Sequence, residues 1–447
     1  MKKLLNNKLL SGALVLSLGG LLTKVLGAFY RIPLTNLLGA EGIGIYQAVF
    51  PLYSLLLTAS STGVPNGIAK MISGGDVSDG YSVLKSALKV FLPLGLIGSL
   101  VLLLLCKPIS NMQGNGSAYI AYALISPSVI LVSVISCFRG FFQGNLNMKP
   151  TAISQIIEQL IKLIFGLSLC SLINGKVELK AGLATLSVSI SEFIACAYFF
   201  ILFKIKGYSF KGLTGVKTNC LKLIKTVFPI MLSTIVIPVA RTVESFFVLN
   251  LINRYSENAT SLYGLYSGAV ESIVSVPVAV CYAIAVTAVP IISKLDKQGK
   301  SCKNKIIQAI FYTLITATCF ALAFIFLPSV AVKILYPSLN EEFTKITINL
   351  LKLSSISVVF LPLMQTSASV LIAKGKFYAP VITSSVGVTV KLITSYFLLK
   401  TPKINIFGAV ISDILCYFVA TFLNLIYTIN KLFIKRSKQC TKLPQSV

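Results

Sequence analysis

The sequence predicts an all-α membrane protein with about twelve spanning helices. Hydrophobic residues make up 55% of the 447 residues, only 12% are charged, and the mean hydropathy is +0.85. The apolar residues fall in runs of about 20, the length that crosses a hydrocarbon core of roughly 30 Å. Backbone groups in lipid must be satisfied internally, so these runs are expected to be helices. The alternating segments of about ten residues that a β-barrel needs are not visible.

Twelve apolar runs define the predicted spans, with the usual error of about two to four residues at each end. They cover residues 9–29, 43–68, 86–106, 118–138, 152–173, 182–203, 227–251, 263–292, 306–327, 350–373, 380–399 and 407–429.

The charge is strongly positive, with 40 Lys and Arg against 13 Asp and Glu, a formal net charge of +27. Such a charge is also typical of nucleic-acid-binding proteins, but here the positive residues lie mainly between the apolar runs. Most fall in the two tails and in alternate loops, one of which is assigned Arg139 and Lys149. The positive-inside rule then predicts a protein of the inner or plasma membrane with both termini in the cytoplasm, and no nucleic-acid partner.

An internal repeat predicts two bundles of about six helices each. Residues 143–164 and 374–393 both run from a Gly through a short basic loop to a Pro, then into an apolar helix that carries Lys-Leu-Ile. Both enter the membrane in the same direction, so the halves are related by a pseudo-two-fold axis along the membrane normal. Chance similarity between apolar segments is the alternative. The predicted organisation is a half at 1–203, a basic linker at 204–225 along the membrane surface, a half at 226–430 and a basic tail at 431–447.

Residue types argue against an enzyme. The chain has no His, which removes a Ser-His-Asp triad and the commonest proton shuttle and metal ligand. No phosphate-binding Gly-rich loop or nucleophile elbow is present. The ten Cys are scattered without a Cys-x-x-Cys pair, which favours small packed residues over a metal site or disulfide framework. We expect no catalytic residue, no cofactor and no metal.

The candidate functional residues are therefore the charges within apolar runs, because an ionised side chain at mid-bilayer costs roughly 2.5–3.5 kcal/mol on insertion scales. Lys24 and Arg31 lie seven residues apart, on one face of the first helix. Together they suit a phosphate-bearing headgroup, Arg through bidentate hydrogen bonds and Lys as a point charge. The alternative for Arg31 is a position at the membrane interface.

Two pairs can form along a helix. Glu158 and Lys162 are spaced i, i+4, and Arg241 and Glu244 are spaced i, i+3, so each pair shares a helix face. A structural ion pair and a contact with substrate are both open for the first pair. The central position of the second pair favours the lining of a cavity, with Arg241 as a third contact for the headgroup.

Three carboxylates have no local cation, namely Glu192, Glu271 and Asp413. Each needs a distant partner or a neutral state in lipid. Either suits a proton- or cation-coupled carrier, and a polar clasp between helices is the alternative. Lys391 is a candidate partner for one of them, but the sequence does not say which.

Three prolines interrupt apolar runs and are candidate hinges: Pro65, which Gly63 and Gly67 flank, Pro238 and Pro277. Such breaks re-aim backbone groups or allow bending.

Two segments resemble a known family. They are LTKVLGAFYRIPLTNLLGAEGIGIYQAVFPLYSLLLTASSTGVPNGIAK at residues 22–70 and FRGFFQGNLNMKPTAISQIIEQLIK at residues 138–162. Both look like the stage V sporulation protein B and polysaccharide-transporter family. That family belongs to the multidrug, oligosaccharidyl-lipid and polysaccharide flippase superfamily, as do the lipid II flippases.

The resemblance implies two six-helix bundles around a central cavity and transport by alternating access. It also implies that Lys24 and Arg31 meet the pyrophosphate of the cargo. Two departures are visible: Glu271 lies where lipid II flippases carry an Arg, and two further C-terminal helices of many relatives are not seen.

Three functions follow. The first is a flippase for a lipid-linked saccharide of the polyprenyl pyrophosphate type, a peptidoglycan or polysaccharide precursor, with spore cortex formation as one setting. The second is a cation-coupled exporter of organic cations, driven by protons or sodium, in which the isolated carboxylates are central. The third is a non-transporting scaffold that recruits a cell-wall synthase.

Overall fold

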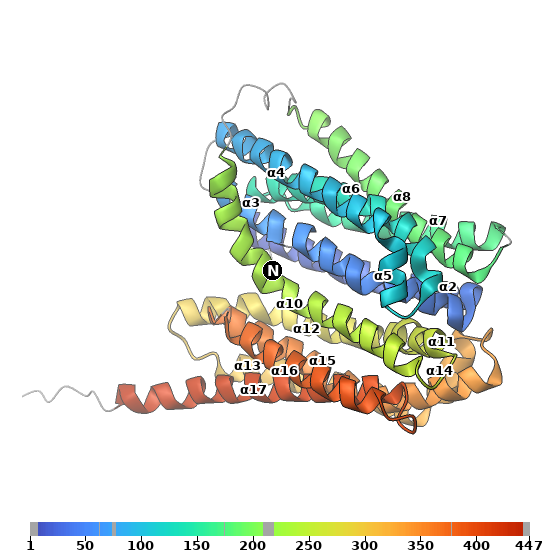
Figure 1. Cartoon of the computed structure of the whole chain (residues 1–447). Helices are drawn as coiled ribbons and strands as arrows, with labels where there is room; N and C mark the ends of the chain where they lie inside the picture. Colours follow the sequence, from blue (N-terminus) through green and yellow to red (C-terminus); the bar gives the residue numbers. More distant parts are fainter. Residues whose placement is uncertain are drawn as a thin grey trace, which may run out of the picture. The chain divides into compact units, whose positions relative to one another are not determined.

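The computed structural model describes residues 8–61, 63–73, 77–173, 175–208, 219–376 and 378–440, and these are helical with no strands. The helices of the first part of the chain are α2 (Lys8–Ser61), α3 (Gly63–Ile72), α4 (Val77–Leu104), α5 (Cys106–Met112), α6 (Tyr119–Gly144), α7 (Lys149–Leu172), α8 (Val177–Ile205) and α10 (Cys220–Ile252), with a short 3₁₀ turn, η1 (Gly116–Ala118). Those of the second part are α11 (Ala259–Tyr263), the π-helical η2 (Gly264–Val270), α12 (Glu271–Lys297), α13 (Lys303–Phe326), α14 (Pro328–Leu335), α15 (Glu341–Ala373), α16 (Tyr378–Leu399) and α17 (Phe407–Cys440) (Figure 1).

Within the described ranges, eleven helical stretches are long and apolar enough to cross a membrane. The first of them, Gly19–Ile72, is 54 residues long and overlaps two of the predicted spans, 9–29 and 43–68. The non-helical Gly39 (φ 68°, ψ −176°) divides it, and this left-handed backbone favours Gly because a Cβ would be strained there. The predicted all-α, multi-pass architecture is confirmed.

The helix ends differ from the predicted spans in several places, two of which involve charged segments. Arg139, expected in a loop, lies within α6. The last helix, predicted to end near residue 429, continues to Cys440 as part of α17. Of the predicted linker, residues 209–218 lie outside the described ranges, as do residues 441–447 of the predicted tail.

The chain divides into two compact units. Unit 1 contains Met1–Ser272 and Leu335–Phe343, and unit 2 contains Ile273–Ile334 and Thr344–Val447. The helices α10, α11 and η2 therefore belong with the N-terminal helices. The predicted halves, 1–203 and 226–430, are based on the sequence repeat and not on contacts between helices. This division stays a prediction.

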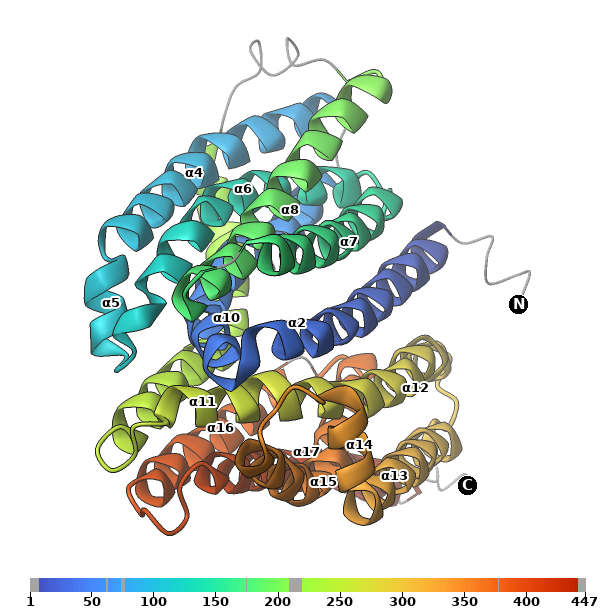
Figure 2. The same ribbon diagram turned by 90° about the vertical axis from the view of Figure 1, so that its right-hand side faces the viewer.

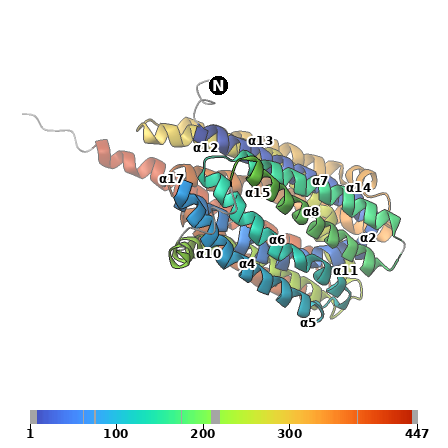
Figure 3. The same cartoon turned by 90° about the horizontal axis from the view of Figure 1, so that it is seen from above.

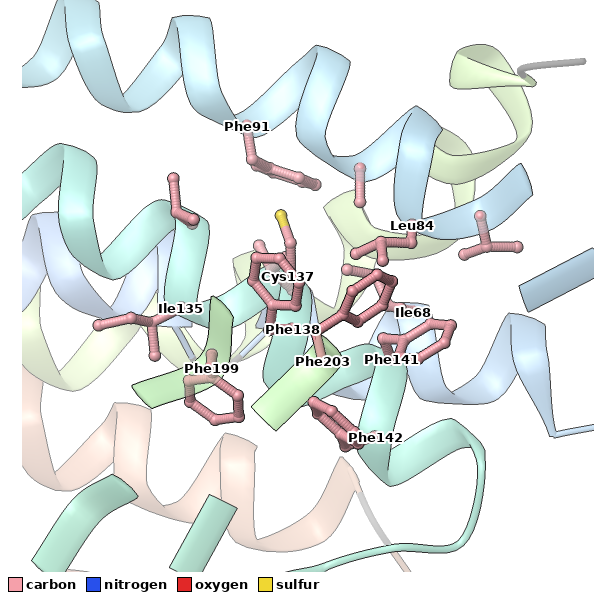
Figure 4. Close-up of a cluster of buried hydrophobic side chains, with 14 of the residues drawn as sticks. Ile68, Leu84, Phe91, Ile135, Cys137, Phe138, Phe141, Phe142, Phe199 and Phe203 are labelled. Carbon is pink, nitrogen blue, oxygen red and sulfur yellow. The ribbon is translucent and has the colours of Figure 1, made fainter. Parts of the chain in front are cut away.

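Unit 1 has a layered helical core. Helices α4, α6 and α8 run side by side, and α7 lies between α8 and α2 (Figures 2 and 3). Phenylalanines fill the space between α6 and α8. Phe138 stacks near Phe199 with ring centroids 6.2 Å apart, and Phe141 meets Phe203 at 5.6 Å (Figure 4). Aromatic side chains bury a large area each, so this cluster stabilises the contact between the two helices.

Glycines bring α2 against α11 and η2 within unit 1. A Cβ on Gly44 would lie 2.0 Å from the carbonyl oxygen of Thr260, and one on Gly264 would lie 2.3 Å from that of Ala40. Neither contact allows a larger residue without moving the backbone. The Gln47 side chain also donates to the carbonyl oxygen of Ser267 in η2, at 3.1 Å.

Tyr336, in the segment of unit 1 that follows α14, closes the same region. Its hydroxyl donates to the carbonyl oxygen of Ala269 at 2.9 Å. Burial raises the pKa of Tyr336, so the phenol stays neutral and keeps its donor.

Unit 2 is held by polar contacts between apolar helices. The hydroxyls of Thr313 on α13 and Thr366 on α15 lie 3.1 Å apart. Thr383 on α16 donates to Asn424 on α17 at 2.6 Å. Gly387 allows α16 to approach α17, because a Cβ there would lie 2.8 Å from the carbonyl oxygen of Cys416. Small and hydroxyl-bearing residues at such interfaces are typical of membrane helices.

Candidate functional site

Helix α7 of unit 1 has a row of partly buried polar residues along one side. The polar residues Gln155, Glu158, Gln159 and Lys162 follow one another at spacings of three, one and three residues, so they share one side of the helix. All four are partly buried, although α7 is otherwise apolar. Because α7 packs on both α2 and α8, this row lies next to the polar side chains of those helices.

Arg139 on α6 is the partner of Glu158. Its Nη2 atom donates to Glu158 Oε1, and Nε and Nη2 also donate to the Ser154 hydroxyl at 3.2 and 3.0 Å. Both charged side chains are about nine-tenths buried. The i, i+4 spacing suggested Lys162 as the partner of Glu158, but the ion pair instead joins α7 to α6. Arg presents several donors in a fixed fork, which lets it satisfy both acceptors at once.

Lys162 is left for a different contact. Its ammonium lies 5.5 Å from the ring centroid of Tyr30 on α2, within the range of a cation–π interaction. Gly166, one turn further along α7, makes room for that ring, because a Cβ there would lie 2.3 Å from the Tyr30 hydroxyl. Tyr30 itself is 1% exposed, so the ring is fixed by its packing.

Arg31 is the second cation at this position. It interacts electrostatically with Lys162 and with the tyrosines at 30 and 46. Within the described part of the chain, neither Arg31 nor Lys162 has a carboxylate at ion-pair distance. We call Arg31, Lys162 and Tyr30 the cation pair site. Two cations that form no ion pair among the described residues suit the binding of an anion.

Glu192 on α8 lies beside this site. It is 7% exposed, and its Oε2 atom has no hydrogen-bond partner among the described residues. It interacts electrostatically with Glu158, Arg139 and Lys162. The sequence shows no cation close to Glu192 on its own helix. In the structure the nearby cations are Arg139 on α6 and Lys162 on α7, and Arg139 is already paired with Glu158.

The other predicted residues of unit 1 lie elsewhere on its helices. Lys24 is exposed on α2, and Arg241 is exposed on α10. Glu244 is buried and accepts a hydrogen bond from the Tyr266 hydroxyl at 3.3 Å. Glu244 and the half-buried Glu271 both act electrostatically on Tyr263, so these two acids gather around the tyrosines of α11 and η2.

Unit 2 contains a separate ion pair. Lys391 Nζ on α16 lies 2.6 Å from Asp413 Oδ1 on α17, and both side chains are about nine-tenths buried. Of the three carboxylates without a local cation, Asp413 is therefore the one that Lys391 meets. The pair joins two helices of one unit, as expected of a polar clasp.

The candidate hinge prolines differ in their surroundings. Pro65 is buried in the first turn of α3, just after the end of α2 at Ser61. Helices α10 and α12 run through Pro238 and Pro277 without ending. A hinge role for any of the three stays a prediction.

The interpretation of the sequence missed Arg139 and Tyr30. The sequence pattern places Arg139 in a loop because a basic loop follows closely. A usable signal was present, since Phe138, Phe141 and Phe142 surround Arg139 and the turn residues begin only at Gly144. Tyr30 had no signal in one sequence, because its role depends on where α7 packs. Among the described residues, no group of three or more His, Cys, Asp or Glu side chains could hold a metal ion.

The fold is that of a multi-pass membrane protein with charged side chains in its interior. Two solved structures share the two-lobe fold. One is a lipid II flippase MurJ in an inward closed conformation, with a TM-score of 0.72 and 16% identity over 97% of this chain and 94% of that one. The other is an inward-facing MATE family multidrug resistance transporter of the MOP superfamily, with a TM-score of 0.73 and 11% identity over 93% and 96%.

The family of polysaccharide biosynthesis proteins matches residues 9–296, and the chain belongs to that family. It is 26% identical to the lipid II flippase MurJ of Bacillus subtilis (strain 168), over 92% of this chain and 81% of that protein. It is also 26% identical to the stage V sporulation protein B of the same organism, over 65% of this chain and 59% of that protein. The resemblance that the two segments predicted is confirmed.

Proposed function

We propose that the protein is a flippase that carries a lipid-linked saccharide precursor across the membrane by alternating access. The observation that carries the proposal is the cation pair site, where Arg31 and Lys162 come together from α2 and α7 without a carboxylate at ion-pair distance. The names of the relatives support this cargo class, since one is a lipid II flippase.

Electrostatics favours an anion between these two cations. Like charges about 5–15 Å apart repel by roughly 1–3 kcal/mol at an effective dielectric constant near 20. A diphosphate replaces that repulsion by two attractions, one bidentate through the guanidinium and one to the ammonium. Tyr30 holds the Lys162 ammonium over its ring, which limits the freedom that binding would otherwise remove.

Lys24 and Arg241 extend the proposed path of the headgroup. Lys24 lies two turns before Arg31 on α2, on the same face and exposed. It would receive the diphosphate before or after Arg31 does. Arg241 is exposed on α10 and is proposed as a contact with the saccharide.

The proposed setting is the cell membrane, with both termini in the cytoplasm, as the distribution of Lys and Arg predicts. The cargo would be a peptidoglycan or polysaccharide precursor, including one for the spore cortex, in view of the relative named as a sporulation protein. A cell-wall synthase is the partner that would use the translocated precursor.

A second candidate function is the export of organic cations. The likeness to a MATE transporter shows the fold alone. The specific observation in its favour is Glu192, a buried carboxylate that could attract a cation. Resistance assays separate the two functions, because only the exporter predicts that overexpression protects cells from cationic drugs and that Glu192→Gln removes the protection.

Native mass spectrometry of the purified protein tests the flippase. We expect a co-purifying polyprenyl diphosphate lipid on the wild type and its loss in Arg31→Gln and Lys162→Gln. Lys107→Gln is the matched control, since the Lys107 ammonium lies 5.4 Å from the ring centroid of Tyr119, the same kind of contact away from the site. Equal lipid occupancy in all four proteins would contradict the proposal.

A further inference from the structure

Two asparagines of unit 1 bind backbone segments that are distant in sequence. Asn36 follows the first predicted span on α2, and its Nδ2 atom donates to the carbonyl oxygen of Leu335 at 2.7 Å. Asn250 lies near the end of α10, and its Nδ2 atom donates to the carbonyl oxygen of Met112 at 2.9 Å. Each amide therefore fastens the end of one helix to a connection between two others.

The two contacts are equivalent under the predicted repeat. Asn36 follows the first span of the first predicted half, and Asn250 ends the first span of the second. Met112 lies in the connection after the third span of the first half, and Leu335 lies in the connection after the third span of the second. Each half supplies one asparagine and receives the other, as expected of parallel repeats related by an axis along the membrane normal.

The first contact is reinforced on both sides of the carboxamide. We call Asn36 with residues 335–343 the first latch. The Ser338 hydroxyl donates to Asn36 Oδ1 at 2.8 Å, and the side chain of Tyr336 is 1% exposed. Residues 335–343 pack with unit 1, although the chain on either side of them belongs to unit 2. Release of this segment therefore breaks no helix of unit 1.

The second contact depends on a glycine turn. We call Asn250 and Asn253 with the turn at residues 112–114 the second latch. The Asn253 side chain donates to the carbonyl oxygen of Gly114. Gly114 has a φ of 79°, and a Cβ on it would lie 2.9 Å from Asn250 Oδ1. A glycine is needed both for this left-handed backbone and for the close approach of α10.

Both latches consist of polar contacts that water can replace. Asn36 and Asn250 are half-buried, and Asn253 and Ser338 are exposed. A hydrogen bond at such a position replaces one made with water, so it contributes little net stability. All four residues lie in or beside connections on the side opposite to the termini, which the distribution of Lys and Arg places outside the cell. Contacts of this kind suit a closure that opens and closes.

We propose that the two latches form a gate that closes the outer end of the transport path, and that release of the cargo requires both latches to open. This inference rests on the proposed function and concerns its release step. Asn36 lies five residues after Arg31, about 7.5 Å further along the helix axis towards the outer side. Because both latches hold one closure, the opening of either favours the opening of the other.

Hydrogen–deuterium exchange of the full-length protein in lipid nanodiscs tests the gate without any cargo. Asn36→Leu keeps the side-chain size but removes the hydrogen bonds of the first latch. We expect amide exchange to become several-fold faster in both latches, and Asn250→Leu should have the same effect. The matched control is Asn145→Leu, which removes a similar hydrogen bond to a backbone carbonyl at the other end of unit 1 and should leave both latches unchanged. Faster exchange confined to the altered latch would overturn the inference.

A cross-link across the first latch tests whether it opens during transport. Asn36→Cys with Ser338→Cys is joined by a short thiol-reactive cross-linker that reduction cleaves, and peptide mass spectrometry verifies the link. In proteoliposomes we expect the link to stop the transport of a fluorescent polyprenyl-diphosphate saccharide and reduction to restore it. The control is Thr383→Cys with Asn424→Cys, which replaces a similar side-chain contact in unit 2 and should transport equally with and without the link.

The outcomes separate the gate from the flippase. Undiminished transport by the linked protein would overturn the gate while the proposed function stands. A wild type that moves no saccharide lipid would overturn the proposed function, and the exchange measurements, which need no cargo, would still decide whether the two latches open together.

Discussion

The two units each bury a lysine at a similar place in the predicted repeat, and the two lysines have different partners. Lys391 in unit 2 lies 2.6 Å from Asp413. Lys162 in unit 1 lies over the ring of Tyr30 and next to Arg31, while the nearby Glu158 pairs with Arg139. The charge of Lys391 is paired within its unit, whereas Lys162 forms no ion pair among the described residues.

Under the proposed function, this difference separates structural charges from functional ones. In a buried ion pair such as Lys391 and Asp413, each charge compensates the other. The pair stabilises the fold mainly because removing one partner would leave the other charge uncompensated. Lys162 forms no ion pair among the described residues and is repelled by Arg31, and we propose that an anionic cargo relieves this repulsion when it binds. Location inside the membrane is common to both lysines, so location alone does not mark a functional residue.

The largest expected effect on stability comes from breaking the pair in unit 2. Asp413→Leu leaves Lys391 buried without its partner and should lower the free energy of unfolding by about 3–5 kcal/mol. The double variant Lys391→Met with Asp413→Leu should recover most of that loss, because it removes both charges. Thermal melting in detergent measures both. A double variant as unstable as the single one would mean that the pair is more than a clasp.

A smaller loss is expected for Arg139→Lys in unit 1. Lysine keeps the charge beside Glu158 but cannot form the fork that also satisfies Ser154. The lost hydrogen bonds should cost about 1–3 kcal/mol. Melting curves of this variant and of Ser154→Ala, which removes only the acceptor, would show how much the fork contributes. An unchanged melting temperature in both variants would contradict its structural role.

Gly166→Ala tests the position of the aromatic ring at the cation pair site. The added methyl group would meet the Tyr30 ring, and overpacking of this kind costs about 1–3 kcal/mol. Because the ring supports Lys162, diphosphate binding should weaken although no charge changes. Gly98→Ala, where a Cβ would meet only a side-chain methyl of Val129 at 3.2 Å, is the control. Tight binding by Gly166→Ala would show that Tyr30 does not position Lys162.

The smallest change in stability is expected for Lys162→Met, within about 1 kcal/mol, because the variant breaks no ion pair and removes both a repulsion from Arg31 and the attractions to Glu192 and Glu158, which offset one another. Its melting temperature should be compared with that of Lys391→Met, which removes the ion-pair partner of Asp413 and should melt at a lower temperature. Similar losses in both would remove the distinction between the two lysines.

The sequence was sufficient for the fold because hydropathy, helix length and the positive loops act over whole segments. It also identified several of the buried charges, since each is rare in an apolar run, but it placed the buried Arg139 in a loop. It did not predict their partners. Glu158 had a local candidate in Lys162, yet Arg139 from another helix took that place. Which residues pair depends on how the helices rotate and pack against one another. Glycines such as Gly166 influence this packing because they contact residues that are distant in sequence.

The central claim is that Lys162 binds the cargo, whereas Lys391 stabilises the fold through its pair with Asp413. The most direct test is the transport of a fluorescent polyprenyl-diphosphate saccharide in proteoliposomes, at equal protein content, by Lys162→Gln and by the neutral double variant Lys391→Gln with Asp413→Asn. We predict that the first variant melts like the wild type and loses transport, and that the double variant keeps transport. Normal transport by Lys162→Gln, or loss of transport in a well-folded double variant, would contradict the account.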